Sequence, residues 1–225
     1  NSDYENFAIL EGPQKDANLI TGVLEDNYQV LPIRRLRNQT KQQMEKFFSI
    51  DLREEVRARQ IKSLVIWFAG HGKFINDVGY WIPVDARRDE EFTYYSLNTL
   101  KASMETYMNY LTHVLVVTDA CESGPSFYQA MRSDVKSRNC ADWKATQFKS
   151  SQVLSSAGYE LAVDDSQFTR TFVNALRGNP NTCISIDEIA TQVTKAVSQN
   201  NRQKPKFGKI TGLKDEDGTF FFVKK

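Results

Sequence analysis

Residues 114–124 constrain most strongly what this chain can fold into. They form the run Val-Leu-Val-Val-Thr-Asp-Ala-Cys-Glu-Ser-Gly, which opens with four consecutive apolar or β-branched residues. Such a run is too short for an ordinary helix, and a glycine follows it. The pattern predicts a strand buried on both faces of a parallel sheet, and therefore an α/β fold.

The predicted strand carries Asp119 and Cys121 at its carboxyl end. Ligands of open α/β sheets bind at this edge, so a thiol placed there is a candidate nucleophile. The alternative is that Cys121 is a small buried hydrophobe, which is the commonest role of an unpaired cysteine.

A second buried strand is predicted at residues 64–68, and it ends in Ala69-Gly70-His71-Gly72. The helical spacing of residues 96–111 predicts a crossover from this strand to the one that carries Cys121. Right-handed crossovers leave both strands parallel, so His71 and Cys121 are expected to meet at one edge of the sheet. An imidazole there can favour the thiolate and later protonate a leaving amine. The backbone N–H groups of Gly72 and Cys121 are candidate donors to the oxyanion.

The rest of the chain alternates in the same way within one predicted domain, residues 1–225. Residues 79–85 predict a short exposed strand or hairpin outside the central sheet, and residues 132–150 a long loop without periodicity. The other expected elements are helices at 15–27, 40–59 (N-cap Thr40), 126–131, 168–176 and 185–197 (capping box Ser185 and Glu188), and strands at 28–36, interrupted by Pro32, at 152–156 and at 218–223. Residues 204–213 and the strand at 218–223 close the domain.

Composition excludes several classes of protein. The formal net charge is +1, which favours neither nucleic acid nor an anionic membrane, and no apolar run approaches the roughly 18 residues of a membrane span. Cys121, Cys140 and Cys183 are odd in number and widely spaced, so they predict no disulfide framework, and a reducing, cytoplasmic location. The only histidines, His71 and His113, are far apart, so no zinc site or other cofactor is expected. We expect a structural role for His113, and we interpret Cys140 and Cys183 as incidental thiols.

The two motifs together resemble those of the caspase-like cysteine peptidases, the clan of caspases, metacaspases, paracaspases and bacterial CHAT-type peptidases. The matching segments are Leu-Val-Ile-Trp-Phe-Ala-Gly-His-Gly at 64–72 and the run at 114–124. Weaker matches at 10–16, 79–85 and 155–172 extend the resemblance over nearly the whole chain. It implies a three-layer α/β/α fold, with a mostly parallel central sheet and helices on both faces.

The resemblance implies a cysteine endopeptidase acting on a protein substrate through Cys121 and His71, with Gly72 beside them and no metal or cofactor. In members that cut after Arg or Lys, an Asp at the position of Asp119 lines the specificity pocket. The alternative is that Asp119 bonds local backbone and only shapes the turn. The segment matching the family's substrate-binding strand contributes Ser155, Ser156 and Ala157, and acidic residues follow it at Glu160, Asp164 and Asp165.

Family domains begin with a hydrophobic strand before the segment that matches residues 1–10. The expectation is that this strand lies upstream and that the chain is the carboxyl-terminal part of a longer protein, regulated by a sensor or repeat module. The basic residues Lys136, Arg138, Lys144 and Lys149 form a solvated face, or self-cleavage sites if the specificity is basic.

Two rival functions remain. One is a catalytically silent scaffold of the same fold, which the presence of His71, Gly72 and Cys121 disfavours. The other is a cysteine phosphatase, which needs an Arg shortly after the nucleophile, and residues 122–127 contain none.

Overall fold

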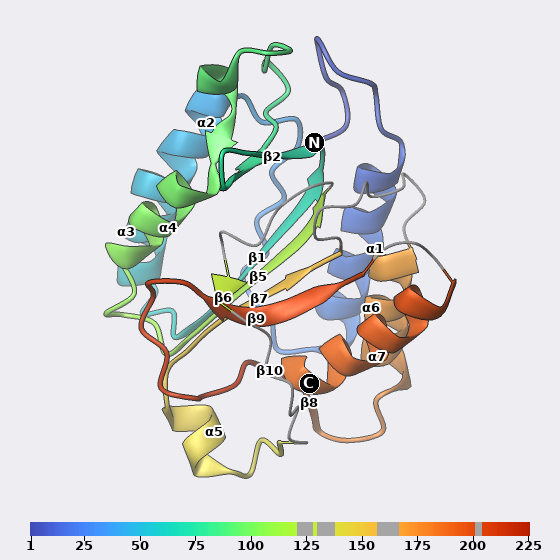
Figure 1. Ribbon diagram of the computed structural model, residues 1–225. Coiled ribbons are helices and arrows are strands. Elements are labelled where there is room, and N and C mark those ends of the chain that lie inside the picture. The colour runs from blue at the N-terminus through green and yellow to red at the C-terminus, as the bar shows by residue number, and fades with distance from the viewer. Residues whose placement is uncertain (121–127, 130–137, 157–166, 201–203) are drawn as a thin grey trace.

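A central sheet of five strands runs through the protein in the order β1-β5-β7-β9-β6 (Figure 1). The computed structural model describes residues 1–120, 128–129, 138–156, 167–200 and 204–225. Strands β1, β5 and β7 are parallel, and β9 is antiparallel to both β7 and β6. The strands are β1 Ser63–Gly70, β5 His113–Ala120, β6 Tyr128–Gln129, β7 Ser150–Ser155 and β9 Lys206–Ile210.

Strand β5 lies between β1 and β7, and each of its eight residues is buried. This confirms the doubly buried strand expected from its apolar run. Its side chains enter two cores, because alternate residues of a strand face opposite sides of a sheet: Leu115 and Val117 belong to one core, and Val114 and Val116 to the other.

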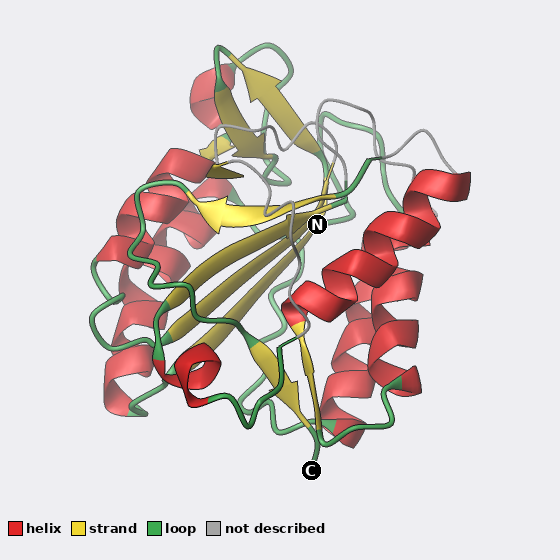
Figure 2. Cartoon of the chain, turned by 60° about the horizontal axis from the view of Figure 1, so that its bottom comes forward, coloured by secondary structure: helices red, strands yellow, loops and turns green. Residues whose placement is uncertain are grey.

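Helices cover both faces of the sheet, which gives the three layers expected of the fold (Figure 2). The first helical layer packs with Leu115 and Val117, and the second helical layer packs with Val114 and Val116. No helix in the described ranges combines the length and apolar character needed to cross a membrane. The first layer holds α1 Gly12–Asn27, α6 Gln167–Gly178 and α7 Ile186–Asn200; the second holds α2 Lys41–Lys46, the π-helical turn η1 Phe47–Asp51, α3 Leu52–Ala58 and α4 Leu97–Glu105.

Local capping signals begin two of these helices where the sequence predicts. The Thr40 side chain accepts a hydrogen bond from the backbone of Gln43, and the Gln43 side chain bonds back to Thr40. At α7 the Glu188 N–H donates to Ser185 Oγ at 3.2 Å, and Ser185 N–H donates to Glu188 Oε2 at 3.3 Å. Both are capping boxes, which satisfy backbone donors that the first helical turn leaves unpaired.

A separate three-stranded sheet contains β2 Gly72–Ile75, β3 Val78–Trp81 and β4 Tyr95–Ser96; the 3₁₀ turn η2, Glu91–Thr93, precedes β4. Its separation from the central sheet confirms the prediction for residues 79–85, but their expected exposure is wrong, since none of them is exposed and most are buried, Trp81 among them. That side chain is 1% exposed, its ring stacks on Phe68 at 4.4 Å, and its Nε1–H donates to Thr118 Oγ1 at 3.0 Å. The ring therefore joins this small sheet to both β1 and β5.

A two-stranded antiparallel sheet, β8 Cys183–Ser185 and β10 Phe221–Val223, lies beside the first helical layer. The end of α1 meets it: Gln29 N–H donates to Val223 O at 2.8 Å. The fully buried Tyr28 donates its hydroxyl to Leu176 O of α6 at 2.6 Å, and it pairs with Lys224 in a β-bridge.

Three local expectations are wrong. The strand expected at 28–36 is reduced to one β-bridge, between Tyr28 and Lys224, and residues 29–36 form no strand. Tyr128 and Gln129, placed in a helix at 126–131, pair as a strand with Ile210 and Lys209 of β9; the partner strand, which the local sequence does not show, sets their conformation. The expected loop at 132–150 contains the helix α5, Trp143–Gln147, which begins where Asp142 accepts a hydrogen bond from Lys144 N–H.

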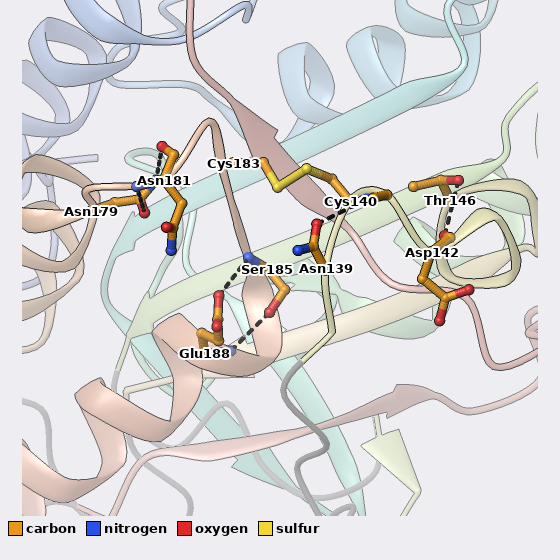
Figure 3. Close-up of a disulfide and its surroundings, with 10 residues drawn as sticks. Asn139, Cys140, Asp142, Thr146, Asn179, Asn181, Cys183, Ser185 and Glu188 are labelled. Carbon is orange, nitrogen blue, oxygen red and sulfur yellow. Dashed lines mark hydrogen bonds between the residues drawn. A yellow bond between two sulfur atoms is a disulfide. The ribbon is translucent and has the colours of Figure 1, made fainter.

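The prediction that Cys140 and Cys183 are incidental thiols is also wrong, because they form a disulfide (Figure 3). The bond joins the segment before α5 to the first residue of β8, across a sequence separation of 43 residues. Widely spaced cysteines showed no framework because the approach of α5 to β8 is a tertiary feature. The cysteine content therefore no longer supports a reducing compartment.

His113 has the structural role expected of it. It is buried, its Nε2 lies 2.8 Å from Thr146 O and its Nδ1 2.8 Å from Ser150 Oγ. Since a carbonyl only accepts, Nε2 carries the hydrogen and Ser150 donates to Nδ1. Burial lowers the pKa of His113 below its ordinary value, although the bond to Thr146 and the nearby Asp215 carboxylate oppose that shift.

Stability is therefore expected to fall as the pH drops below about 6.5, where the unfolded histidine takes up a proton that the folded one resists. The free energy of unfolding, measured by urea denaturation from pH 8 to pH 5, should fall less steeply in His113→Gln than in the unmodified protein. An equal slope in His113→Gln and in the unmodified protein would contradict the prediction.

Candidate active site

The carboxyl ends of β1, β5 and β7 meet at one edge of the central sheet. Gly70 is opposite Ala120, and Thr118 is opposite Ser155. The edge thus gathers His71, Asp119, Ser155 and Ser156 from three separate segments, as the parallel arrangement predicts. The other predicted site residues, Cys121, Ala157, Glu160 and Asp164, lie outside the described residues.

Gly70 ends β1 in a conformation that favours glycine, with φ +153°. A Cβ atom there would clash with the hydroxyl oxygen of Tyr4. That hydroxyl accepts a hydrogen bond from the backbone N–H of His71 at 2.8 Å. The glycine therefore lets the amino-terminal segment approach closely enough to hold the backbone of His71.

The imidazole of His71 is positioned by the same amino-terminal segment. Its ring lies 4.7 Å from that of Tyr4 and 5.8 Å from that of Phe7. Nε2 lies 2.8 Å from the carbonyl oxygen of Ala8. Because that carbonyl can only accept, Nε2 carries the hydrogen, and in the neutral ring Nδ1 then has the lone pair of a base.

The Phe7 ring makes cation–π contacts with Lys73 and Arg88. Lys73 Nζ lies 5.8 Å from the centre of the Phe7 ring and 5.4 Å from that of Tyr94. The Arg88 guanidinium lies 6.0 Å from the Phe7 ring, and its Nε–H donates to Asn6 O at 2.8 Å. Cation–π contacts at these distances stabilise the ring that packs on His71.

Gly72 follows His71 at the start of β2 and is buried opposite Trp81. The carbonyl of His71 accepts a hydrogen bond from Ile82 N–H at 3.0 Å. These contacts fix the backbone on the carboxyl side of the histidine. The role of the Gly72 N–H as an oxyanion donor remains a prediction.

Asp119 is 7% exposed, and its Oδ2 accepts a hydrogen bond from Thr169 Oγ1 at 3.0 Å. Thr169 belongs to α6, so this contact ties the carboxylate to a helix of the layer that covers the sheet. A buried carboxylate needs such donors, because desolvation disfavours its charge. No motif singles out Thr169.

Ser155 and Ser156 are both buried, with exposures of 1% and 0%. The Ser156 N–H donates to Thr118 O at 3.0 Å, which continues the pairing of β7 with β5 by one residue. Their predicted contact with substrate remains a prediction.

Fold and site together define a three-layer α/β protein whose candidate catalytic histidine follows one strand and whose buried aspartate ends the neighbouring strand. The model of the caspase domain family matches residues 1–214, and the chain belongs to this family. Membership implies a cysteine peptidase, a hydrolase of peptide bonds. The match does not distinguish metacaspases from CHAT-type peptidases. Comparison with curated proteins gave no match.

Proposed function

We propose that the protein is a cysteine endopeptidase that cleaves a protein substrate with Cys121 as nucleophile and His71 as its acid–base partner. The observation that carries this proposal is the position of His71. It is the residue after Gly70, which is paired with Ala120, and its Nε2 bonds to Ala8 O at 2.8 Å. Cys121 is the residue after Ala120. Each proposed reactive residue is therefore the next residue in the sequence after one member of the Gly70–Ala120 pair, which joins the neighbouring strands β1 and β5.

In the proposed reaction, Nδ1 of His71 takes the proton of the thiol and the thiolate attacks the carbonyl carbon of the substrate. The N–H groups of Gly72 and Cys121 would stabilise the oxyanion. The imidazolium then protonates the leaving amine, and water hydrolyses the thioester to release the acid and regenerate the thiol. The Ala8 carbonyl contributes by fixing the tautomer and the orientation of the ring.

Specificity for Arg or Lys before the scissile bond is the finer part of the proposal. Asp119 supports it as a buried carboxylate at the same edge as His71. A carboxylate in a pocket favours a cationic side chain through charge-assisted hydrogen bonds. Regulation by an attached or partner module is likewise proposed from the family resemblance.

The test is a panel of fluorogenic peptides that differ only in the residue before the scissile bond. The unmodified protein should hydrolyse the Arg or Lys peptides, and Cys121→Ala should hydrolyse none. Asp119→Asn keeps the size of the side chain and should lose most of the preference for basic over apolar residues.

The outcomes separate the parts of the proposal. Cleavage after apolar residues that depends on Cys121 would retain the peptidase and exclude the role given to Asp119. If peptides are not turned over and a peptidyl electrophile does not label Cys121, the silent scaffold is the better description.

A further inference from the structure

The segment of residues 138–144, here called the Cys140 segment, connects to α5 and is poorly covered. Asn139 and residues 141–144 are exposed, and Cys140 is half-buried. Trp143 is 61% exposed although it is the largest side chain there. Hydrophobic packing therefore contributes little to holding this segment in place.

Most hydrogen bonds of the Cys140 segment are local. Asn139 accepts from Ala141 and Asp142, and Asp142 accepts from Lys144. Arg138 at its start donates to Asp217 O and, at 3.0 Å, to Thr219 Oγ1. Among the described contacts, the disulfide is the one bond or ion pair that ties residues 139–144 to a distant part of the chain.

The other end of the disulfide is well anchored (Figure 3). Cys183 is 7% exposed and pairs with Val223 of β10. Two residues later, the capping box of Ser185 and Glu188 begins α7. The bond thus fastens a loosely held segment to a rigid one.

We propose that the Cys140–Cys183 disulfide is a reversible redox site that controls access of proteases to the Cys140 segment. A dithiol reductant is the co-reactant. Its thiolate attacks a disulfide sulfur to form a mixed disulfide, and its second thiol displaces the protein sulfur. The reductant is oxidised to its own disulfide while Cys140 and Cys183 gain two electrons and two protons as thiols. Half-buried Cys140 is the end that a reductant reaches.

Reduction should expose one peptide bond in particular, Lys144–Ala145. Proteases cleave chain that can open locally, and the rate follows the population of the open form. In the oxidised protein this bond lies four residues from the crosslink, and buried Ala145 follows it, with its carbonyl bonded to Thr219 N–H at 2.9 Å. Without the crosslink, residues 139–144 keep only their local hydrogen bonds, between the attachment of Arg138 to Asp217 and Thr219 on one side and that of Ala145 on the other.

The experiment is limited trypsin digestion of Cys121→Ala, with and without a dithiol, followed by peptide mass analysis. This background removes self-cleavage, so the result does not depend on the proposed peptidase activity. Reduction should raise the rate of cleavage after Lys144 by at least about tenfold. Cleavage after Lys101, in the middle of α4, reports unfolding of the whole domain and should not change.

The matched variant adds Cys140→Ser and Cys183→Ser to the same background. It should be cut quickly after Lys144 both with and without dithiol. Equal rates after Lys144 in the oxidised and reduced protein would overturn the proposal. An equal acceleration of cleavage after Lys101 would also overturn it, because the disulfide would then stabilise the whole fold and not this segment in particular. So would Cys140 and Cys183 remaining as free thiols after mild oxidation.

Discussion

Replacing His71 with alanine is expected to lower kcat/KM for peptide hydrolysis by about 10²–10⁴-fold, the usual contribution of a positioned acid–base group. The variant loses the base that forms the thiolate and the acid that protonates the leaving amine. Tyr4 and Phe7 also lose the ring that they contact at 4.7 and 5.8 Å. The peptide panel proposed above measures the effect.

The pH profile distinguishes this role from a structural one. In the unmodified protein kcat/KM should depend on the ionisation of a cysteine–histidine pair, whereas the residual rate of His71→Ala should rise with pH as the isolated thiol ionises. His113→Gln is the matched control and should keep most of the activity, because His113 lies at the start of β5, away from the site edge. A His71→Ala variant that keeps more than about a tenth of the activity would contradict the assignment.

Replacing Trp81 with alanine is expected to lower the free energy of unfolding by about 3–5 kcal/mol. The side chain is 1% exposed, so its loss removes buried apolar area and leaves a cavity against Phe68. It also leaves the buried Thr118 hydroxyl without the indole N–H that it accepts at 3.0 Å. Unsatisfied buried groups add to the destabilisation.

Chemical denaturation of the two proteins measures this change. Trp143→Ala makes the same substitution at a side chain that is 61% exposed, and it should change stability by less than about 1 kcal/mol. Similar losses for the two variants would show that the burial of Trp81 does not determine its contribution.

Central elements of this fold could be predicted because their signals are local. The apolar run of β5 is sufficient to mark a strand that is buried on both faces. Thr40, Ser185 and Glu188 mark helix starts because capping involves residues only three positions apart. The two-residue strand β6 and the disulfide could not be predicted, since each depends on a partner that folding brings from far along the chain.

In the candidate site, too, features with a local signal could be predicted, and features that depend on distant residues could not. The positions of His71 and Asp119 at one edge of the sheet could be predicted, because His71 follows β1, Asp119 lies beside the last residue of β5, and parallel strands end at a common edge. The contacts around them could not. Ala8 acts through a backbone carbonyl, which every residue has, and Thr169 is one of several hydroxyls in its helix. Only the tertiary fold selects them.

The joining of Tyr28 to Lys224 has a consequence for how the domain assembles during synthesis. Helix α1 is made well before the residues that meet its carboxyl end, Leu176 and Val223, because these lie far along the chain. Contacts so distant in sequence are slow to form, because a long loop must close first. Until then Ile20, Val23 and Leu24, which the finished fold buries, stay accessible to other chains. The partly made domain therefore keeps an apolar surface on α1 that α6 can cover only once it has been made.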